Sequence, residues 1–145
     1  MSFERLQNGL RVKMGSVLIG INPTGKFSAN FYIFTKEPEE EFSKMIYLPG
    51  EYEIDGIFIF GYGNKEVNYL LVDQENDERL LILESEVKIP ENLEIFLDKS
   101  FYVLVLSQRK DLREILREVE IEKLVLTNTS QNKIFENFDC EVINI

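Results

Sequence analysis

The sequence has no histidine and no tryptophan, and it has a single cysteine, Cys140. One cysteine cannot form a disulfide within the chain, so we expect a reducing, cytoplasmic location. Asp139 and Glu141 flank Cys140, and their charges disfavour a thiolate, so we expect no catalytic thiol here. The absence of histidine removes the side chain that most readily exchanges protons near neutral pH and that most often ligates metals.

Positive charge and long apolar runs are also scarce. The chain has 16 Lys and Arg against 26 Asp and Glu, a net charge of −10. Proteins that bind nucleic acids usually carry a basic face, so we expect no nucleic-acid partner. The longest apolar runs, such as Phe101–Leu106, fall far below the roughly 20 residues of a spanning helix, and the first residues lack the apolar stretch of a signal peptide. We therefore expect no membrane partner.

The apolar content is sufficient for a buried core. Hydrophobic residues make up 44% of the 145 residues, and no repeat, linker or low-complexity tract interrupts them. We expect one domain over residues 1–145. Short apolar segments separated by turns predict a β-rich first half, and Asp55-Gly56 is the strongest hairpin signal among them. The predicted strands are Leu10–Met14, Ser16–Ile21, Asn30–Phe34, Tyr52–Ile54, Ile57–Tyr62, Tyr69–Val72 and Leu80–Leu83.

The second half mixes strands with helices. Phe101–Leu106 is apolar throughout, which is typical of a central strand covered on both faces. Asp111–Val119 has apolar residues at i, i+3, i+4 and i+7 and predicts a helix. Weaker patterns predict helical turns at Glu37–Lys44, Glu91–Leu97 and Lys133–Phe138, and strands at Leu124–Leu126 and Glu141–Ile145. The expected fold class is α/β.

The segment Pro49-Gly-Glu-Tyr-Glu-Ile-Asp-Gly56 carries a family resemblance. It resembles a signature of small hydrolases with the metallo-β-lactamase fold, through Pro49, Gly50, Glu51, Tyr52, Glu53 and Gly56. The resemblance implies an αββα sandwich, in which two mixed β-sheets are flanked by helices. Because this chain is short for that fold, we expect a trimmed form in which one or two peripheral helices are missing or reduced.

Members of that family bind zinc or manganese through histidines and aspartates. The resemblance assigns their ligand positions, or the neighbourhood of these, to Asn8, Lys36, Pro38, Glu40, Glu41, Ser85 and Thr129. Zinc binds imidazole, thiolate or carboxylate donors. Proline has no side-chain donor, and lysine brings its own positive charge. We therefore expect vestigial metal-site positions, no metal and no other cofactor, and a protein that is not an enzyme.

Two features have more than one interpretation. The acidic run Glu37–Glu41 could hold Mg²⁺ or Ca²⁺, or it could be the solvated first turn of a helix after Pro38. The second is favoured, because adjacent glutamates on a helix point in different directions. Along Ile57–Phe60 both faces of the strand are apolar, so the aromatic rings belong either to the core or to an interface between copies of the chain.

The function that we expect is a non-catalytic, pseudoenzyme-like scaffold that contacts a protein partner or a second copy of itself. The alternative is a domain that binds a small molecule in the vestigial cleft between Lys36–Glu41, Glu84-Ser85 and residues 127–130. A hydrolase with a new, metal-free site is a third option. It would need an activated nucleophile, and no histidine is present to act as the base for Ser85 or Thr129.

Overall fold

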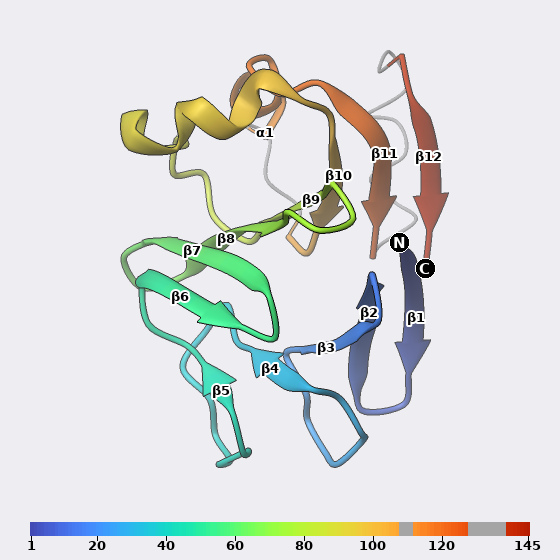
Figure 1. The fold of residues 1–145 in the computed structure, drawn as a ribbon. Helices are drawn as coiled ribbons and strands as arrows, with labels where there is room; N and C mark the ends of the chain where they lie inside the picture. Colours follow the sequence, from blue (N-terminus) through green and yellow to red (C-terminus); the bar gives the residue numbers. More distant parts are fainter. Residues whose placement is uncertain (108–111, 128–138) are drawn as a thin grey trace.

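Two β-sheets form the body of the molecule, which we describe from a computed structural model over residues 1–107, 112–127 and 139–145 (Figure 1). The first sheet has the order β1-β2-β3-β4-β5 and the second the order β12-β11-β10-β9-β8-β7-β6. The first sheet comprises β1 (Ser2–Leu6), β2 (Gly9–Met14), β3 (Val17–Ile21), β4 (Phe31–Ile33) and β5 (Met45–Ile46). The second comprises β6 (Gly50–Ile54), β7 (Ile57–Gly63), β8 (Val67–Asp73), β9 (Glu78–Leu83), β10 (Phe101–Val105), β11 (Ile121–Leu126) and β12 (Glu141–Asn144).

Both sheets combine antiparallel and parallel pairs. In the first, β1, β2 and β3 pair antiparallel, whereas β3–β4 and β4–β5 are parallel. In the second, β6 to β9 form an antiparallel meander, and β9, β10, β11 and β12 run parallel. The parallel pairs direct the carboxyl ends of neighbouring strands to the same edge, which is where the candidate site lies.

The alternation of side chains along the second sheet divides the core into two layers. Ile57, Ile59, Tyr69 and Ile82 face the first sheet and pack with its inner residues, such as Phe31. The opposite face packs beneath the helices through Leu70, Leu81, Phe101, Val103, Leu124 and others. Every residue of β8 is buried, as a strand covered on both faces requires.

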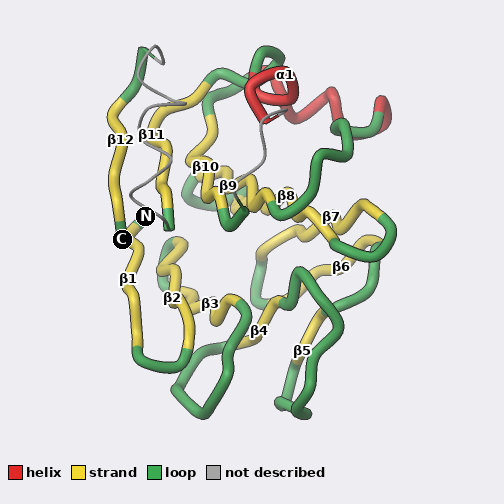
Figure 2. The backbone as a smooth tube through the Cα atoms, turned by 180° about the vertical axis from the view of Figure 1, so that it is seen from behind, coloured by secondary structure: helices red, strands yellow, loops and turns green. Residues whose placement is uncertain are grey.

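The helices are few and lie on one side. A 3₁₀ helix, η1 (Glu91–Asp98), and a short helix, α1 (Leu112–Leu116), both cover the second sheet, as Figure 2 shows from behind. Ile115, Leu116 and Val119 are buried against that sheet, so the face predicted for this helix is correct although the helix is shorter than expected. Among the described residues, no helix covers the outer face of the first sheet.

The expectation of an α/β sandwich flanked by helices is therefore wrong: the described chain is mostly β. One cause is Glu37–Lys44, which forms no helix. In a helix, Glu37 would face Glu40 and Glu41 at i+3 and i+4, where like charges repel. Phe42 would be the only large apolar residue available to bury. The predicted helix at Lys133–Phe138 lies outside the described residues.

Aromatic rings replace a helix over the outer face of the first sheet. The ring of Tyr32 lies 5.8 Å from Phe27 and 5.0 Å from Phe42 between centroids. Gly20 leaves room for this packing, since a Cβ there would come within 2.5 Å of the Tyr32 ring. Phe42, the apolar residue of the acidic segment, thus stabilises a loop instead of a helix. Each such ring pair contributes about 1 kcal/mol to the free energy of unfolding.

Most of the predicted strands are present, including the hairpin of β6 and β7, whose turn residues Asp55 and Gly56 have φ angles of 52° and 81°. Sequence patterns missed β1 and β5. The Phe58 and Phe60 rings of β7 are half-buried and pack against the second core layer, where Phe60 lies 5.0 Å from Phe96 of η1 between ring centroids. An interface between copies of the chain at these rings stays a prediction.

Candidate functional site

Three strands of the two sheets end close together. Asn22 follows β3, Thr35 and Lys36 come shortly after β4, and Glu84 follows β9. Because β3 and β4 are parallel, their carboxyl ends lie at one edge of the first sheet, next to the end of β9 in the second. The polar residues at these ends therefore meet where the two sheets adjoin.

A hydrogen-bonded chain of polar groups crosses from one sheet to the other. The Asn22 side chain accepts a hydrogen bond from the Thr35 backbone amide at 2.9 Å and donates one to Thr35 Oγ1 at 2.8 Å. Thr35 Oγ1 in turn donates to Glu84 Oε2 at 3.0 Å. Thr35 is fully buried and Glu84 is only 5% exposed. The network therefore holds a carboxyl group in a fixed position with little access to water.

Lys36 supplies the counter-charge for this carboxyl group. Its Nζ lies 3.4 Å from Glu84 Oε1 and 4.0 Å from Glu66 Oε2, while the lysine side chain is 64% exposed. Burial raises the pKa of the Glu84 carboxyl, and the hydrogen bond from Thr35 and the charge of Lys36 oppose that rise. Glu84 is therefore easier to protonate than an ordinary glutamate, which is a property typical of functional carboxyl groups.

Replacing Glu84 with glutamine is expected to stabilise the fold at neutral pH. A carboxyl whose folded pKa is raised binds more protons in the folded state, so its contribution to the free energy of unfolding falls as pH rises above the ordinary pKa of 4.5. Glutamine keeps an acceptor for Thr35 and removes the buried charge. Urea denaturation should show a gain of about 1 kcal/mol at pH 8 and none at pH 4.

Glu37→Gln, at an exposed position, is the matched control for this titration and should change the free energy of unfolding little at either pH. A destabilisation by Glu84→Gln at pH 8 would show instead that the charged pair with Lys36 outweighs the burial of the carboxylate.

The backbone that carries Glu84 is held by a buried asparagine. Asn68 of β8 is fully buried, and its Oδ1 accepts hydrogen bonds from the backbone amides of Glu84 and Ser85, each at 2.8 Å. Its Nδ2 donates to the Ser85 carbonyl at 3.1 Å. One side chain thus satisfies three backbone groups just after β9 and sets where Glu84 points.

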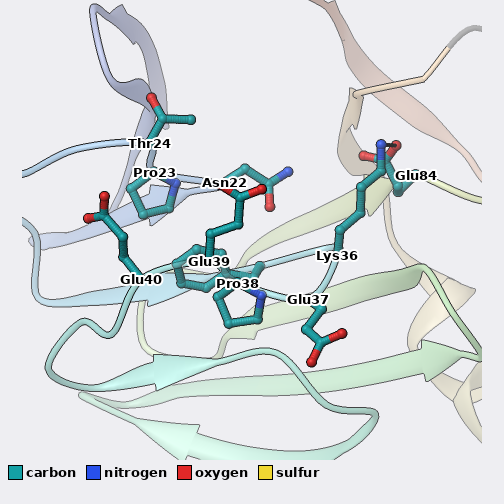
Figure 3. Close-up of a pocket in the computed structure, with 10 residues that line it drawn as sticks. Asn22, Pro23, Thr24, Lys36, Glu37, Pro38, Glu39, Glu40 and Glu84 are labelled. Atoms are coloured by element: carbon teal, nitrogen blue, oxygen red, sulfur yellow. Dashed lines mark ion pairs between the residues drawn. The ribbon is translucent and has the colours of Figure 1, made fainter.

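Two cavities adjoin this network and together form a cleft. The first, about 330 Å³, is bordered by residues of the Asn22–Thr24 turn, Phe34 and the Lys36–Glu40 segment (Figure 3). The second, about 400 Å³, is bordered by Arg5, Gln7, Leu106 and Thr127, among others. Asn22, Lys36 and Glu84 border both cavities. These three residues therefore lie at the centre of the cleft.

The structure brings some of the residues predicted for the site together and separates others. Lys36, Pro38 and Glu40 border the first cavity, whereas Glu41 borders a neighbouring depression with Met45 and Tyr47. The backbone oxygen of Asn8 accepts a hydrogen bond from Thr24 at 2.7 Å, so Asn8 supports the turn beside the cleft.

Among the remaining predicted positions, Ser85 and the signature residues do not line the cleft. Ser85 hydrogen-bonds through its backbone to Asn68, and its Oγ is buried without a hydrogen-bond partner among the described residues. Thr129 lies outside the described residues. The signature residues Pro49, Gly50, Glu51, Tyr52, Glu53 and Gly56 form the edge strand β6 and its turns, where the Tyr52 hydroxyl donates to the Leu48 carbonyl at 2.7 Å.

Sequence reasoning missed the residues that organise the cleft. Asn68, Thr35 and Glu66 were not singled out, and Glu84 was noted only as a neighbour of Ser85. The available signal was a lone asparagine beside the apolar run Tyr69–Val72. A polar residue in a strand covered on both faces must have a specific hydrogen-bond partner.

The comparisons with known proteins rest on structure alone. No protein-family model and no curated protein sequence matches this chain. A crystal structure from Thermotoga maritima, described as a "putative Zn-dependent hydrolase of the metallo-β-lactamase superfamily", is similar with a TM-score of 0.65 over 94% of each chain, at 10% sequence identity. The chain has the metallo-β-lactamase fold. The fold family implied by the signature at Pro49–Gly56 is thereby supported.

The same finding corrects the prediction that the chain is not an enzyme. We drew that prediction from the missing histidines, but the fold matched over 94% of the chain is that of a protein described as a "putative Zn-dependent hydrolase". The absence of histidine bears only on metal binding through imidazole. It says nothing about other chemistry in the cleft around Asn22, Lys36 and Glu84. The prediction is therefore wrong.

The residues around the cleft do not fit a zinc ion of the kind that the fold family implies. Lys36 directs an ammonium group at Glu84, and Pro38 offers no donor. Within residues 1–107, 112–127 and 139–145, no three histidine, cysteine, aspartate or glutamate side chains come together as a metal site. The charge opposite Glu84 is that of a lysine side chain, so we derive no metal-dependent step for this site.

In the same described ranges, no helix has the length and apolar content needed to cross a membrane.

Proposed function

We propose that the chain binds a small polar molecule in the cleft around Asn22, Lys36 and Glu84. The observation that carries this proposal is Glu84, a carboxyl group that is 5% exposed and yet borders both cavities. An ionisable group buried in this way reduces the free energy of unfolding unless its partners compensate. A group that a fold holds at such a position is a candidate for ligand recognition.

The size and lining of the cleft support this function. Ligand sites are concave, about 300–1,000 Å³ in volume, and combine apolar walls with a few convergent polar groups. The two cavities, about 330 and 400 Å³, fall in this range. Phe34 and Pro23 give the first cavity apolar walls, and the Lys36 ammonium group has room to donate to a ligand, because this side chain is 64% exposed.

A fragment screen by ligand-observed NMR tests the proposal. Fragments that bind the native protein are expected to bind Lys36→Ala at least 10-fold more weakly, because the exposed donor at the centre of the cleft is removed. Lys65→Ala, which removes an exposed lysine in the β7–β8 turn, should leave binding unchanged. A screen with no hits, or hits that Lys36→Ala does not weaken, would contradict the proposal.

A second candidate function is hydrolysis of the bound molecule. It is favoured by Glu84, whose raised pKa brings the carboxyl group closer to the range in which a general base accepts and returns a proton. Glu84 would take a proton from a water whose oxygen attacks an acyl carbon of the substrate, and Lys36 would stabilise the negative charge that forms on the carbonyl oxygen. As the bond from that carbon to the leaving group breaks, Glu84 would return the proton to the leaving group. If the native protein hydrolyses a fragment that it binds, and Glu84→Gln still binds that fragment but no longer releases product, this candidate is supported.

The scaffold function, with a protein partner or a second copy of the chain, stays a prediction. The exposed apolar residues nearest to an open sheet edge are Tyr47 and Leu48, between β5 and β6.

A further inference from the structure

The two halves of the cleft differ in charge. Besides the Lys36–Glu84 pair, the first cavity is bordered by Glu37, Glu39 and Glu40, and no second cation among the described residues borders it. Figure 3 shows Glu39 and Glu40 extending toward the Asn22–Thr24 turn, away from the Lys36–Glu84 pair. We call this cavity the acidic half.

The second cavity has the opposite character. Besides the Lys36–Glu84 pair, the charged residue that borders it within the described part of the chain is Arg5, whose guanidinium donates a hydrogen bond to the Ile145 backbone oxygen at 3.2 Å. Among the described residues, two basic side chains, Arg5 and Lys36, and a single carboxyl group, Glu84, therefore border this cavity. We call this cavity the basic half.

Apolar groups also border both halves of the cleft. Phe34 and Pro38 border the acidic half, and Leu10 and Leu106 border the basic half. A ligand that matches the cleft therefore needs a cationic group at one end, an anionic group at the other end, and an apolar side chain next to the anionic group. Opposite charges at the two ends of the cleft favour ligands that carry both charges over ligands that carry only one of them.

From this bipolar lining we infer that the ligand is a zwitterion of the size of a dipeptide, with its ammonium group in the acidic half and its carboxylate in the basic half. The inference rests on the proposed function and specifies its ligand class. Glu39 and Glu40 receive the ammonium group, and Arg5 and Lys36 receive the carboxylate. Leu10 and Leu106 contact an apolar side chain next to that carboxylate.

The probe is L-alanyl-L-leucine, which has all three features. Isothermal titration calorimetry at low ionic strength, where screening is weak, should detect its binding to the full chain. N-acetylation removes the ammonium charge, and C-terminal amidation removes the carboxylate. Each modification is expected to weaken binding at least 10-fold, which corresponds to about 1.4 kcal/mol.

Protein variants assign each charge to its half of the cleft. Glu40→Gln should weaken binding of the dipeptide but not of its N-acetyl derivative, whereas Arg5→Gln should weaken the dipeptide but not its amide. Glu41→Gln and Lys13→Gln are matched controls, because they remove one exposed charge each from outside the cleft. All four positions are exposed, so these variants should fold normally, which their thermal unfolding will verify.

The outcomes separate this inference from the proposed function. If the dipeptide fails to bind while fragments bind in a Lys36-dependent manner, the zwitterion class is wrong and the binding cleft stands. If the acetylated or amidated dipeptide binds as tightly as the parent, the charge assignment is wrong. If neither dipeptide nor fragments bind, the proposed function fails together with this inference.

Discussion

Asn68→Ala should destabilise the protein by about 3 kcal/mol and should also impair ligand binding in the cleft. The side chain of Asn68 is fully buried and accepts hydrogen bonds from the backbone amides of Glu84 and Ser85. Its removal leaves both donors without their acceptor, and each unsatisfied buried amide costs about 1–3 kcal/mol. The segment after β9 would then relax, and Glu84 would lose its defined position.

Urea denaturation of Asn68→Ala gives the change in the free energy of unfolding. The matched control is Asn64→Ala, which removes the same side chain from an exposed position in the β7–β8 turn and should change stability by less than about 0.5 kcal/mol. If the two variants had the same stability, Asn68 would not hold the end of β9. Fragment binding measured on the folded Asn68→Ala protein then tests whether the position of Glu84 matters for the site.

The second large effect is expected for Gly63→Ala, which should destabilise the fold by about 3 kcal/mol. Gly63 ends β7 with a φ angle of 130°, and a Cβ there would lie 2.3 Å from the Glu66 carbonyl oxygen. The obstacle is backbone, which cannot move aside as a flexible side chain can. The turn also carries Glu66, one of the two carboxylates near Lys36, so its distortion should reach the cleft.

Gly56→Ala separates the clash from the backbone strain. Gly56 also has a positive φ angle, 81°, but a Cβ there would meet no atom within 4 Å. Its replacement should cost only the strain of a left-handed conformation, about 1 kcal/mol. Thermal unfolding of both variants measures the difference. Equal destabilisation would mean that contact with Glu66 is not what requires glycine at position 63.

Local sequence pattern was a good guide to the strands of the core. The alternation along Ile57–Phe60 and the Asp55-Gly56 turn predicted the β6–β7 hairpin, because side-chain period and turn chemistry are properties of a few adjacent residues. The same kind of pattern did not predict β5, and it predicted helical turns over Glu37–Lys44 that do not form. β5 is two residues long, and its pairing with β4 depends on a partner from elsewhere in the chain.

The candidate site was less predictable than the fold. The resemblance directed attention to Lys36, Pro38 and Glu40, which do border the cleft. It also directed attention to Ser85, although the side chain at the cleft is that of its neighbour, Glu84. Glu84 and Ser85 are adjacent in the bend after β9, and only the Glu84 side chain borders the cleft, so an assignment that is shifted by one residue names the wrong group.

The sequence by itself determined most of the core strands, that no imidazole group of this chain can take part in its chemistry, and that the chain carries a net charge of −10. Only the tertiary structure decided that Asn22, Thr35 and Glu84 form one hydrogen-bonded chain and that Lys36 lies between an acidic and a basic cavity. Glu84 and Thr35 are 49 positions apart. Periodicity and turn chemistry act over a few residues, whereas the packing of two sheets sets distances between residues that no local pattern relates.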